Sequence, residues 1–179
     1  MAVALAALDA IVVVLGAAGE KRIPVAQLHR LPGDEPERDT VLEHGDLITA
    51  VESPPPGRAT RTRSTYRKIR DRASFAFALV SVAAVLELDV EATRPTILSA
   101  RIALGGVAHA PWRARRAERL LAGALATRES FRRAAAAELE QARPVAGNEF
   151  KVTMAQGVMV SVLAELAGLG EENEEPHDE

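Results

Sequence analysis

The sequence predicts an α+β fold in which an antiparallel sheet is covered by helices near the C-terminus. Two apolar runs, residues 75–88 and 97–107, are rich in β-forming residues and are joined by a short polar connection, which is typical of an antiparallel pair. The first run is too continuous to leave one face in water, so we expect it to be a central strand. Helix-forming segments follow the second run at 114–122, 128–141 and 149–167.

The N-terminal residues predict a smaller set of elements. Residues 2–8 favour a helix by propensity, and residues 11–15 are a β-branched strand. The turn at 16–19 brings residues 21–25 back as a hairpin partner, with Pro24 marking a sheet edge. Residues 27–40 are polar and rich in turn formers, so we expect a loop there.

A further strand is expected at residues 46–52. Strict alternation would place Leu47, Thr49 and Val51 on one face and Ile48 on the other. The proline-rich stretch at 54–57 then breaks the chain, and we expect a domain boundary there. This divides the chain into a unit at 1–57, a unit at 58–170 and an acidic, disordered tail at 171–179.

The last expected helix carries an apolar stripe that could cover a sheet face. Its apolar residues recur every fourth position, at Phe150, Met154, Val158, Val162 and Leu166. The only tryptophan, Trp112, is expected to pack as a core anchor behind the Gly105-Gly106 turn.

Composition indicates a globular chain with weak overall charge. The 179 residues carry a net charge of −3 and include no cysteine, which excludes disulfides and cysteine-ligated clusters within the chain. The N-terminus lacks the basic region of a signal peptide, and we expect no membrane span and a cytoplasmic location.

Few residues are candidates for metal binding, catalysis or phosphate binding. The four histidines, at positions 29, 44, 109 and 177, show no metal-ligand spacing, so we expect no metal site and no catalytic residue. The glycines at 16–19 and 105–106 are expected to form turns, because neither pair opens a helix as a phosphate-binding loop does.

A dense basic run leads into the first apolar run. It could bind nucleic-acid phosphates, although Tyr66 alone offers an aromatic ring for stacking, or it could contact a partner subunit. Its members are Arg58, Arg61, Arg63, Arg67, Lys68, Arg70 and Arg72.

These residues also carry a family resemblance. The pattern Tyr66-x-Lys68-x-Arg70-x-Arg72 followed by the strand at 77–83 resembles the C-terminal domain of the FAD-binding (medium) subunit of molybdenum hydroxylases. This is the xanthine dehydrogenase and carbon monoxide dehydrogenase type of enzyme. The segment 102–114, Ile-Ala-Leu-Gly-Gly-Val-Ala-His-Ala-Pro-Trp-Arg-Ala, is similar to a second hallmark of that family.

The resemblance implies that 1–57 is a remnant of the FAD-binding domain and 58–170 a carbon monoxide dehydrogenase flavoprotein C-terminal domain. The family's glycine-rich N-terminal half is missing, so we expect a fragment, a truncated product or a misassigned start, with an incomplete FAD site. By position, Ile48 matches an aliphatic residue near the isoalloxazine ring and Lys68 a lysine that reaches the flavin. The alternatives are an ordinary core residue for Ile48 and a solvated charge for Lys68.

The implied function is that of an oxidoreductase subunit. In such complexes a large subunit holds molybdopterin, a small subunit holds 2Fe–2S clusters, and FAD passes electrons to an acceptor. We expect these two subunits as partners, neither nucleic acid nor membrane, and a chain that is inactive alone. The alternative is a non-enzymatic assembly domain or a basic nucleic-acid-binding module.

Overall fold

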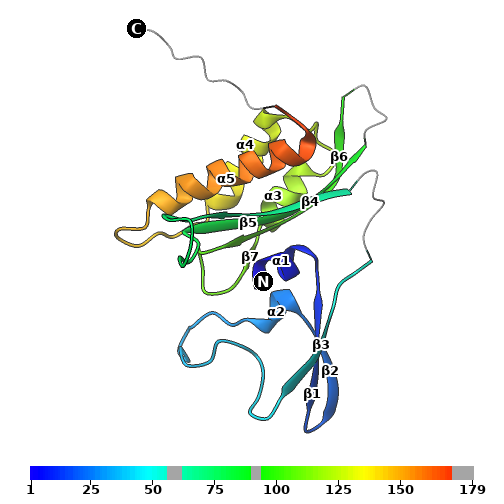
Figure 1. The fold of residues 1–179 in the computed structure, drawn as a ribbon, viewed down its shortest axis with the longest axis vertical. Coiled ribbons are helices and arrows are strands. Elements are labelled where there is room, and N and C mark those ends of the chain that lie inside the picture. Colours follow the sequence, from blue (N-terminus) through cyan, green and yellow to red (C-terminus); the bar gives the residue numbers. More distant parts are fainter. Residues whose placement is uncertain (56–61, 90–93, 171–179) are drawn as a thin grey trace.

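The computed structural model describes residues 1–55, 62–89 and 94–170. These residues form a three-stranded sheet in the order β2-β1-β3 and a four-stranded sheet in the order β4-β5-β6-β7, with every pairing antiparallel. Helices α3, α4 and α5 gather beside the four-stranded sheet, as Figure 1 shows. The predicted α+β class and antiparallel pairing are therefore confirmed.

The elements run in this order: α1 (Ala2–Ala7), β1 (Ile11–Gly16), β2 (Gly19–Pro24), α2 (Val25–Leu28), β3 (Leu47–Glu52), β4 (Thr62–Ile69), β5 (Val80–Asp89), β6 (Thr96–Gly105), β7 (Trp112–Arg113), α3 (Arg115–Leu121), α4 (Arg128–Leu139) and α5 (Phe150–Ala167). The expected helices all form, within a few residues of their predicted bounds.

The four-stranded sheet buries one face against helices. Val80, Val82 and Leu86 of β5 lie in a core formed with α3, α4 and α5, and each is fully buried. Helix α5 packs on β5 and β4, α4 packs on α5, and α3 packs on β6. Burial of branched apolar side chains on this face is the main source of stability for the unit.

Helix α5 follows its predicted stripe except at the start. Val158, Val162 and Leu166 are buried, whereas Phe150 is largely exposed. By length and apolar character alone this helix could cross a membrane, contrary to our expectation that no segment could. Its packing against β5 and α4 is the usual setting of a core helix, which passes the same test.

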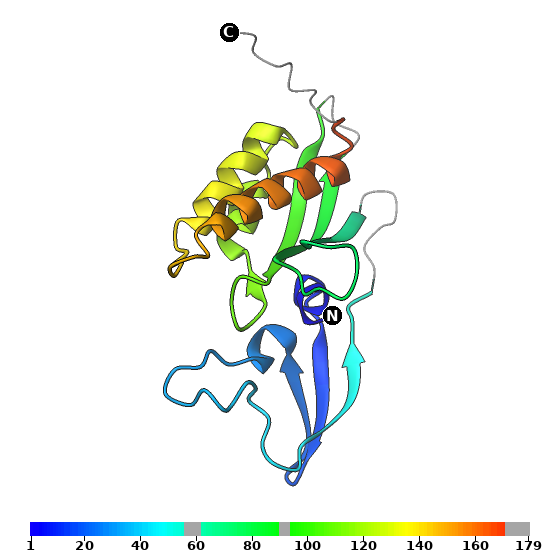
Figure 2. The ribbon, with the colours of Figure 1, turned by 60° about the vertical axis from the view of Figure 1, so that its left-hand side comes forward.

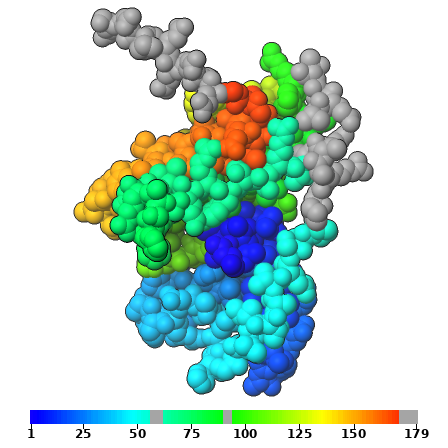
Figure 3. All heavy atoms as spheres, in the orientation of Figure 1, coloured from blue at the N-terminus to red at the C-terminus, as the bar shows by residue number. Residues whose placement is uncertain are grey.

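The opposite face of the large sheet receives α1. Small side chains make room for it, because Ala83 and Ala103 lie in the same core cluster as Ala6 and Ala7. A Cβ on Gly105 would lie only 2.5 Å from Val3 Cγ2. Helix α1 therefore approaches the sheet more closely than larger residues would permit, and Figure 3 shows it between the two parts of the molecule.

The small sheet departs from strict alternation. The β1–β3 register pairs Val12 with Val51 and Val14 with Ile48, and it shifts between Val13 and Val14. Because Val12 and Val14 share a face, Ile48 and Val51 share it too, so their predicted placement on opposite faces was wrong. The irregularity falls at Thr49, where two residues of β3 oppose one step of β1.

The first apolar run was predicted too long. Strand β5 begins at Val80, and residues 75–78 belong to a loop in which Phe75 and Phe77 are 95% and 98% exposed. Phe75 adopts a φ of +50°, which a strand cannot accommodate, and its carbonyl accepts a hydrogen bond from Arg72 Nη2. Three members of the basic run, Arg63, Arg67 and Lys68, lie in β4, an edge strand that pairs with β5. Arg70 and Arg72 follow in the loop that leads to β5.

The hairpin, the loop after it and the domain boundary can each be compared with their predictions. Gly16–Gly19 closes the β1–β2 hairpin and β2 is an edge strand, as expected. Residues 27–28 belong to α2 instead of a loop. The division at 54–57 stays a prediction, because 56–57 lie outside the described residues. The disordered tail at 171–179 also lies outside them and stays a prediction.

Candidate functional site

Strand β4 sends its side chains to two different surfaces. Arg63 Nη1 donates to the carbonyl of Leu166, and Arg67 donates to Ser161 and Glu165, so both arginines face α5. The alternate residues, Tyr66 and Lys68, face the opposite side and are exposed. Lys68 Nζ lies 5.5 Å from the centroid of the Tyr66 ring, within cation–π distance.

This division argues against a nucleic-acid surface on β4. A basic strip that binds phosphates needs its cations on one accessible face. In β4 the arginines at 63 and 67 are instead engaged with α5, and only Lys68 points to the other side. Arg58 and Arg61 lie outside the described residues.

A shallow cavity lies on the Lys68 side of the sheet. Its volume is about 200 Å³, and residues of α1, β4 and β5 line it. Small side chains and one aromatic ring line it, including Ala4, Leu8, Ser64, Tyr66 and Ala83. The result is a mainly apolar recess with a lysine close to its rim.

Ile48 lies on the small sheet and is not a core residue. Its side chain is 45% exposed, and its neighbours Leu47 and Val51 are 62% and 48% exposed. Every residue of β3 is exposed. Ile48 and Val51 share a face of the sheet and form an exposed apolar pair there, whereas Leu47 lies on the other face.

Ile48 and Lys68 come from different sheets. Ile48 belongs to β3 of the small sheet and Lys68 to β4 of the large sheet, with α1 between the two units (Figure 2). The structure therefore does not bring the two side chains into contact; they would form separate walls of any shared site.

Gly105 is the last residue of β6 and pairs with Ser81, so the turn predicted at 105–106 begins only at Gly106. Gly106 has structural reasons to be glycine. Its φ is +76°, and a Cβ there would lie 2.7 Å from the Leu79 carbonyl oxygen. Lys151 Nζ donates to the Gly106 carbonyl oxygen at 2.7 Å. The turn is thus held between the loop before β5 and the start of α5.

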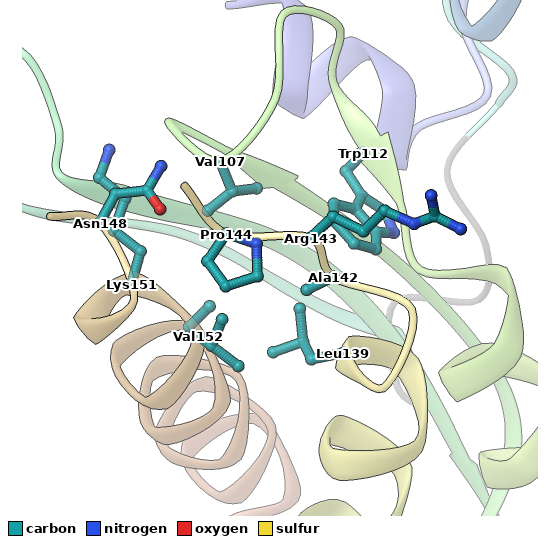
Figure 4. A pocket seen from close by; sticks show the side chains of 10 residues that line it. Val107, Trp112, Leu139, Ala142, Arg143, Pro144, Asn148, Lys151 and Val152 are labelled. Carbon is teal, nitrogen blue, oxygen red and sulfur yellow. The ribbon is translucent and has the colours of Figure 1, made fainter. Parts of the chain in front are cut away.

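Trp112 is half-buried, packs against the core of the large sheet and also lines a second cavity. This cavity, of about 60 Å³, lies between the turn after β6 and the α4–α5 loop, with Arg143 and Lys151 near it (Figure 4). Trp112 Nε1 donates to Glu138 Oε1 at 2.8 Å. Glu138 also accepts from the backbone N–H groups of Arg116 and Ala117, so the carboxylate is saturated and serves to position α3.

An ion-pair network that no sequence pattern indicated joins α1 to the large sheet. Arg113 of β7 donates to Asp9, just after α1, and to Glu118 of α3. Asp9 and Arg113 are 104 residues apart, so no local spacing could indicate the pair. Among the described residues no cluster of His, Asp and Glu suited to a metal ion is found.

Comparison with known proteins identifies the family. The sequence profile described as "CO dehydrogenase flavoprotein C-terminal domain" matches residues 64–166, more than half of the chain. The chain belongs to this family. The match spans β4 to α5, which carry the residues of the sequence resemblance.

Relatives extend the similarity to the small sheet. The chain is 43% identical over 167 residues to the aldehyde oxidoreductase FAD-binding subunit PaoB of Escherichia coli, covering 92% of this chain and 47% of PaoB. It therefore spans about half the length of this curated relative.

Solved structures share the fold at lower identity. CO dehydrogenase from Oligotropha carboxidovorans gives a TM-score of 0.81 at 22% identity, covering 95% of this chain and 57% of that one. Quinoline 2-oxidoreductase from Pseudomonas putida 86 gives 0.78 at 23% identity, covering 94% and 56%.

The side chains present fit the ring end of a flavin. An isoalloxazine has an apolar benzenoid edge and a polar edge that gains negative charge on reduction. The exposed aliphatic group of Ile48 suits the first edge, and the Lys68 cation beside the Tyr66 ring suits the second. The assignment of Ile48 and Lys68 to the cofactor stays a prediction.

Proposed function

We propose that this chain forms part of the FAD-binding subunit of a molybdenum hydroxylase, an oxidoreductase complex. The observation that carries the proposal is the 43% identity to the PaoB FAD-binding subunit over 92% of the chain. The family match over residues 64–166 supports it independently.

In this proposal Ile48 and Lys68 form two walls of the flavin site. Ile48 excludes water from the apolar edge of the ring, and Lys68 places a positive charge near the polar edge. Bound FAD supplies the electron-transfer chemistry, and the chain's own side chains bind and orient it. None of them needs to break a bond in the substrate.

The proposed partners are a large subunit with molybdopterin and a small subunit with 2Fe–2S clusters. These 179 residues contain no cysteine, so they cannot themselves hold a cysteine-ligated cluster. We place the complex in the cytoplasm, with no nucleic acid and no membrane among its partners. The name of the PaoB relative makes aldehydes the first substrate class to test, ahead of xanthine-like compounds.

A chimera of the two proteins tests the proposal. In this PaoB chimera, the 167-residue matching segment of PaoB is replaced by the corresponding segment of this chain. We expect the purified chimera to retain FAD, seen in its visible spectrum after desalting, and to support aldehyde-dependent dye reduction with the PaoB partner subunits. A folded chimera that carries no flavin would contradict the proposal.

A further inference from the structure

Small apolar residues form the contact between α1 and the large sheet. Ala6 and Ala7 pack with Ala83 and Ala103, and Gly105 lies under Val3. Apolar attraction has no direction, and such small side chains offer few ridges to interlock. This contact holds α1 close to the sheet but leaves its direction along the sheet weakly determined.

A directional contact stands at the end of the same helix. Arg113 Nη1 donates to Asp9 Oδ1 at 2.6 Å and Arg113 Nη2 to Asp9 Oδ2 at 3.3 Å, in a two-pronged arrangement. Arg113 Nη1 also donates to the Ala6 carbonyl at 2.5 Å, where the negative end of the helix dipole favours a cation. A bidentate arginine–carboxylate pair defines orientation as well as distance.

Glu118 of α3 fixes the position of the Arg113 side chain. Its side chain is only 7% exposed, and its Nε donates to Glu118, which also accepts from the backbone N–H of Ile102 at 2.7 Å. Burial disfavours the charged guanidinium, but the hydrogen bonds to Asp9 and Glu118 outweigh it and raise the pKa of Arg113. The guanidinium is thus a rigid part of the large unit.

Asp9 connects this anchor directly to the small sheet. It adopts a φ of +53° and turns the chain from α1 into β1, with only Ala10 between Asp9 and the first residue of the strand. Arg101 and Arg115 add weaker contacts to the Asp9 carboxylate, at 3.9 and 3.6 Å. Strand β1 pairs with β3, so any rotation at Asp9 would move Ile48 relative to Lys68.

We propose that Asp9 and Arg113 are positioning residues that set the orientation of the small sheet on the large sheet, and thereby the gap between Ile48 and Lys68. They also hold α1, whose residues Ala4 and Ala7 line the recess beside Tyr66. The positioning role does not rest on the proposed function, whereas its consequence for the flavin does.

The absence of cysteine makes the orientation directly measurable. Cysteines introduced at Glu20 in β2 and Arg119 in α3, both exposed, would carry spin labels on the two units without background labelling. Double electron–electron resonance then reports the distance distribution between them. Circular dichroism confirms that each variant is folded.

We expect a narrow distribution in the parent chain. Asp9→Asn, which leaves the Arg113–Glu118 pair intact, and Arg113→Gln should each broaden it by about twofold, as when a hinge loses its directional contact. Arg116→Gln is the matched control, because it removes an exposed ion pair with Glu140 between α3 and α4. It should leave the distribution as in the parent.

The outcomes separate the two proposals. Unchanged distributions in both Asp9→Asn and Arg113→Gln would overturn the positioning role, whether or not the PaoB chimera binds FAD. Broadened distributions support it, even if the chimera fails to bind FAD and the proposed function falls. In a chimera that does bind FAD, Asp9→Asn should weaken binding about tenfold, the scale expected of a misplaced wall. Unchanged affinity there would overturn the link to the flavin.

Discussion

Replacing Lys68 with alanine should lower the two-electron potential of the flavin in the PaoB chimera. A cation near the polar edge of the ring stabilises the reduced, negatively charged form more than the oxidised form. Lys68 lies at the end of β4, where its backbone is paired with Ser81 of β5, so the sheet restrains its position.

The size of the effect follows from the exposure of Lys68. Two unit charges 4 Å apart interact by about 1 kcal/mol in water and about 4 kcal/mol near a protein surface. Lys68 is exposed, and its Nζ is shared with the Tyr66 ring at 5.5 Å, so the lower half of that range applies. A loss of about 1–2 kcal/mol corresponds to roughly 20–40 mV for a two-electron couple.

Arg67→Ala is the matched control for this measurement. It removes a charge of the same sign from the same strand, but Arg67 contacts Ser161 and Glu165 on the α5 side of the sheet. A redox titration of the chimera should therefore show a lower potential for Lys68→Ala alone. If both variants titrate like the parent chimera, Lys68 is only a surface charge and the reasoning is refuted.

Further predictions concern stability and the second flavin wall. Glu138→Ala should lower the free energy of unfolding, measured by urea denaturation, by about 3 kcal/mol, because Trp112 Nε1 and two backbone N–H groups lose a buried acceptor. Glu140→Ala, at an exposed pair, should cost under about 1 kcal/mol. Gly106→Ala should cost about 1–3 kcal/mol through its positive φ, and an unchanged urea midpoint would contradict that account. Ile48→Asp should weaken FAD binding of the chimera about tenfold, measured by fluorescence titration, without lowering its thermal midpoint, because Ile48 is already exposed. Amide exchange should be slowest in β5, which is paired on both sides, and faster in β3, an exposed edge strand.

Local patterns predicted most elements correctly because each depends on neighbouring residues. The β-branched run of β1, the apolar runs of β5 and β6 and the helices before Pro144 and Gly168 are all determined within a short window. Gly168 adopts a left-handed conformation at the end of α5, as a terminating glycine should.

The errors arise where the way strands connect and pair decides the conformation. The stretch 75–78 is as apolar as a strand, yet the loop must reach from β4 to β5, and Phe75 takes a positive φ there. The bulge at Thr49 depends on pairing with β1, more than thirty residues earlier, as the Thr49–Val13 hydrogen bond illustrates. Neither is visible in the local sequence.

The candidate site was predictable only in part for the same reason. Lys68 and Ile48 could be proposed from the family resemblance, but the Asp9–Arg113 pair depends on α1 folding onto the opposite face of the sheet from α5. An aspartate following an alanine-rich helix and an arginine before another helix are individually unremarkable. Only the tertiary arrangement brings the two side chains together as an ion pair.

The density of arginine and lysine in β4 has one explanation that serves both faces. A side chain on an exposed edge strand can have a defined direction only if the strand itself is anchored. In β4 the pairing with β5 provides that anchor, and the arginines at 63 and 67 direct their side chains to α5, Arg63 to the carbonyl of Leu166 near the end of that helix. The alternate face is left to present Tyr66 and Lys68, although both are exposed to solvent. The same sequence run thus combines structural cations with a proposed functional one, and strand alternation separates the two roles.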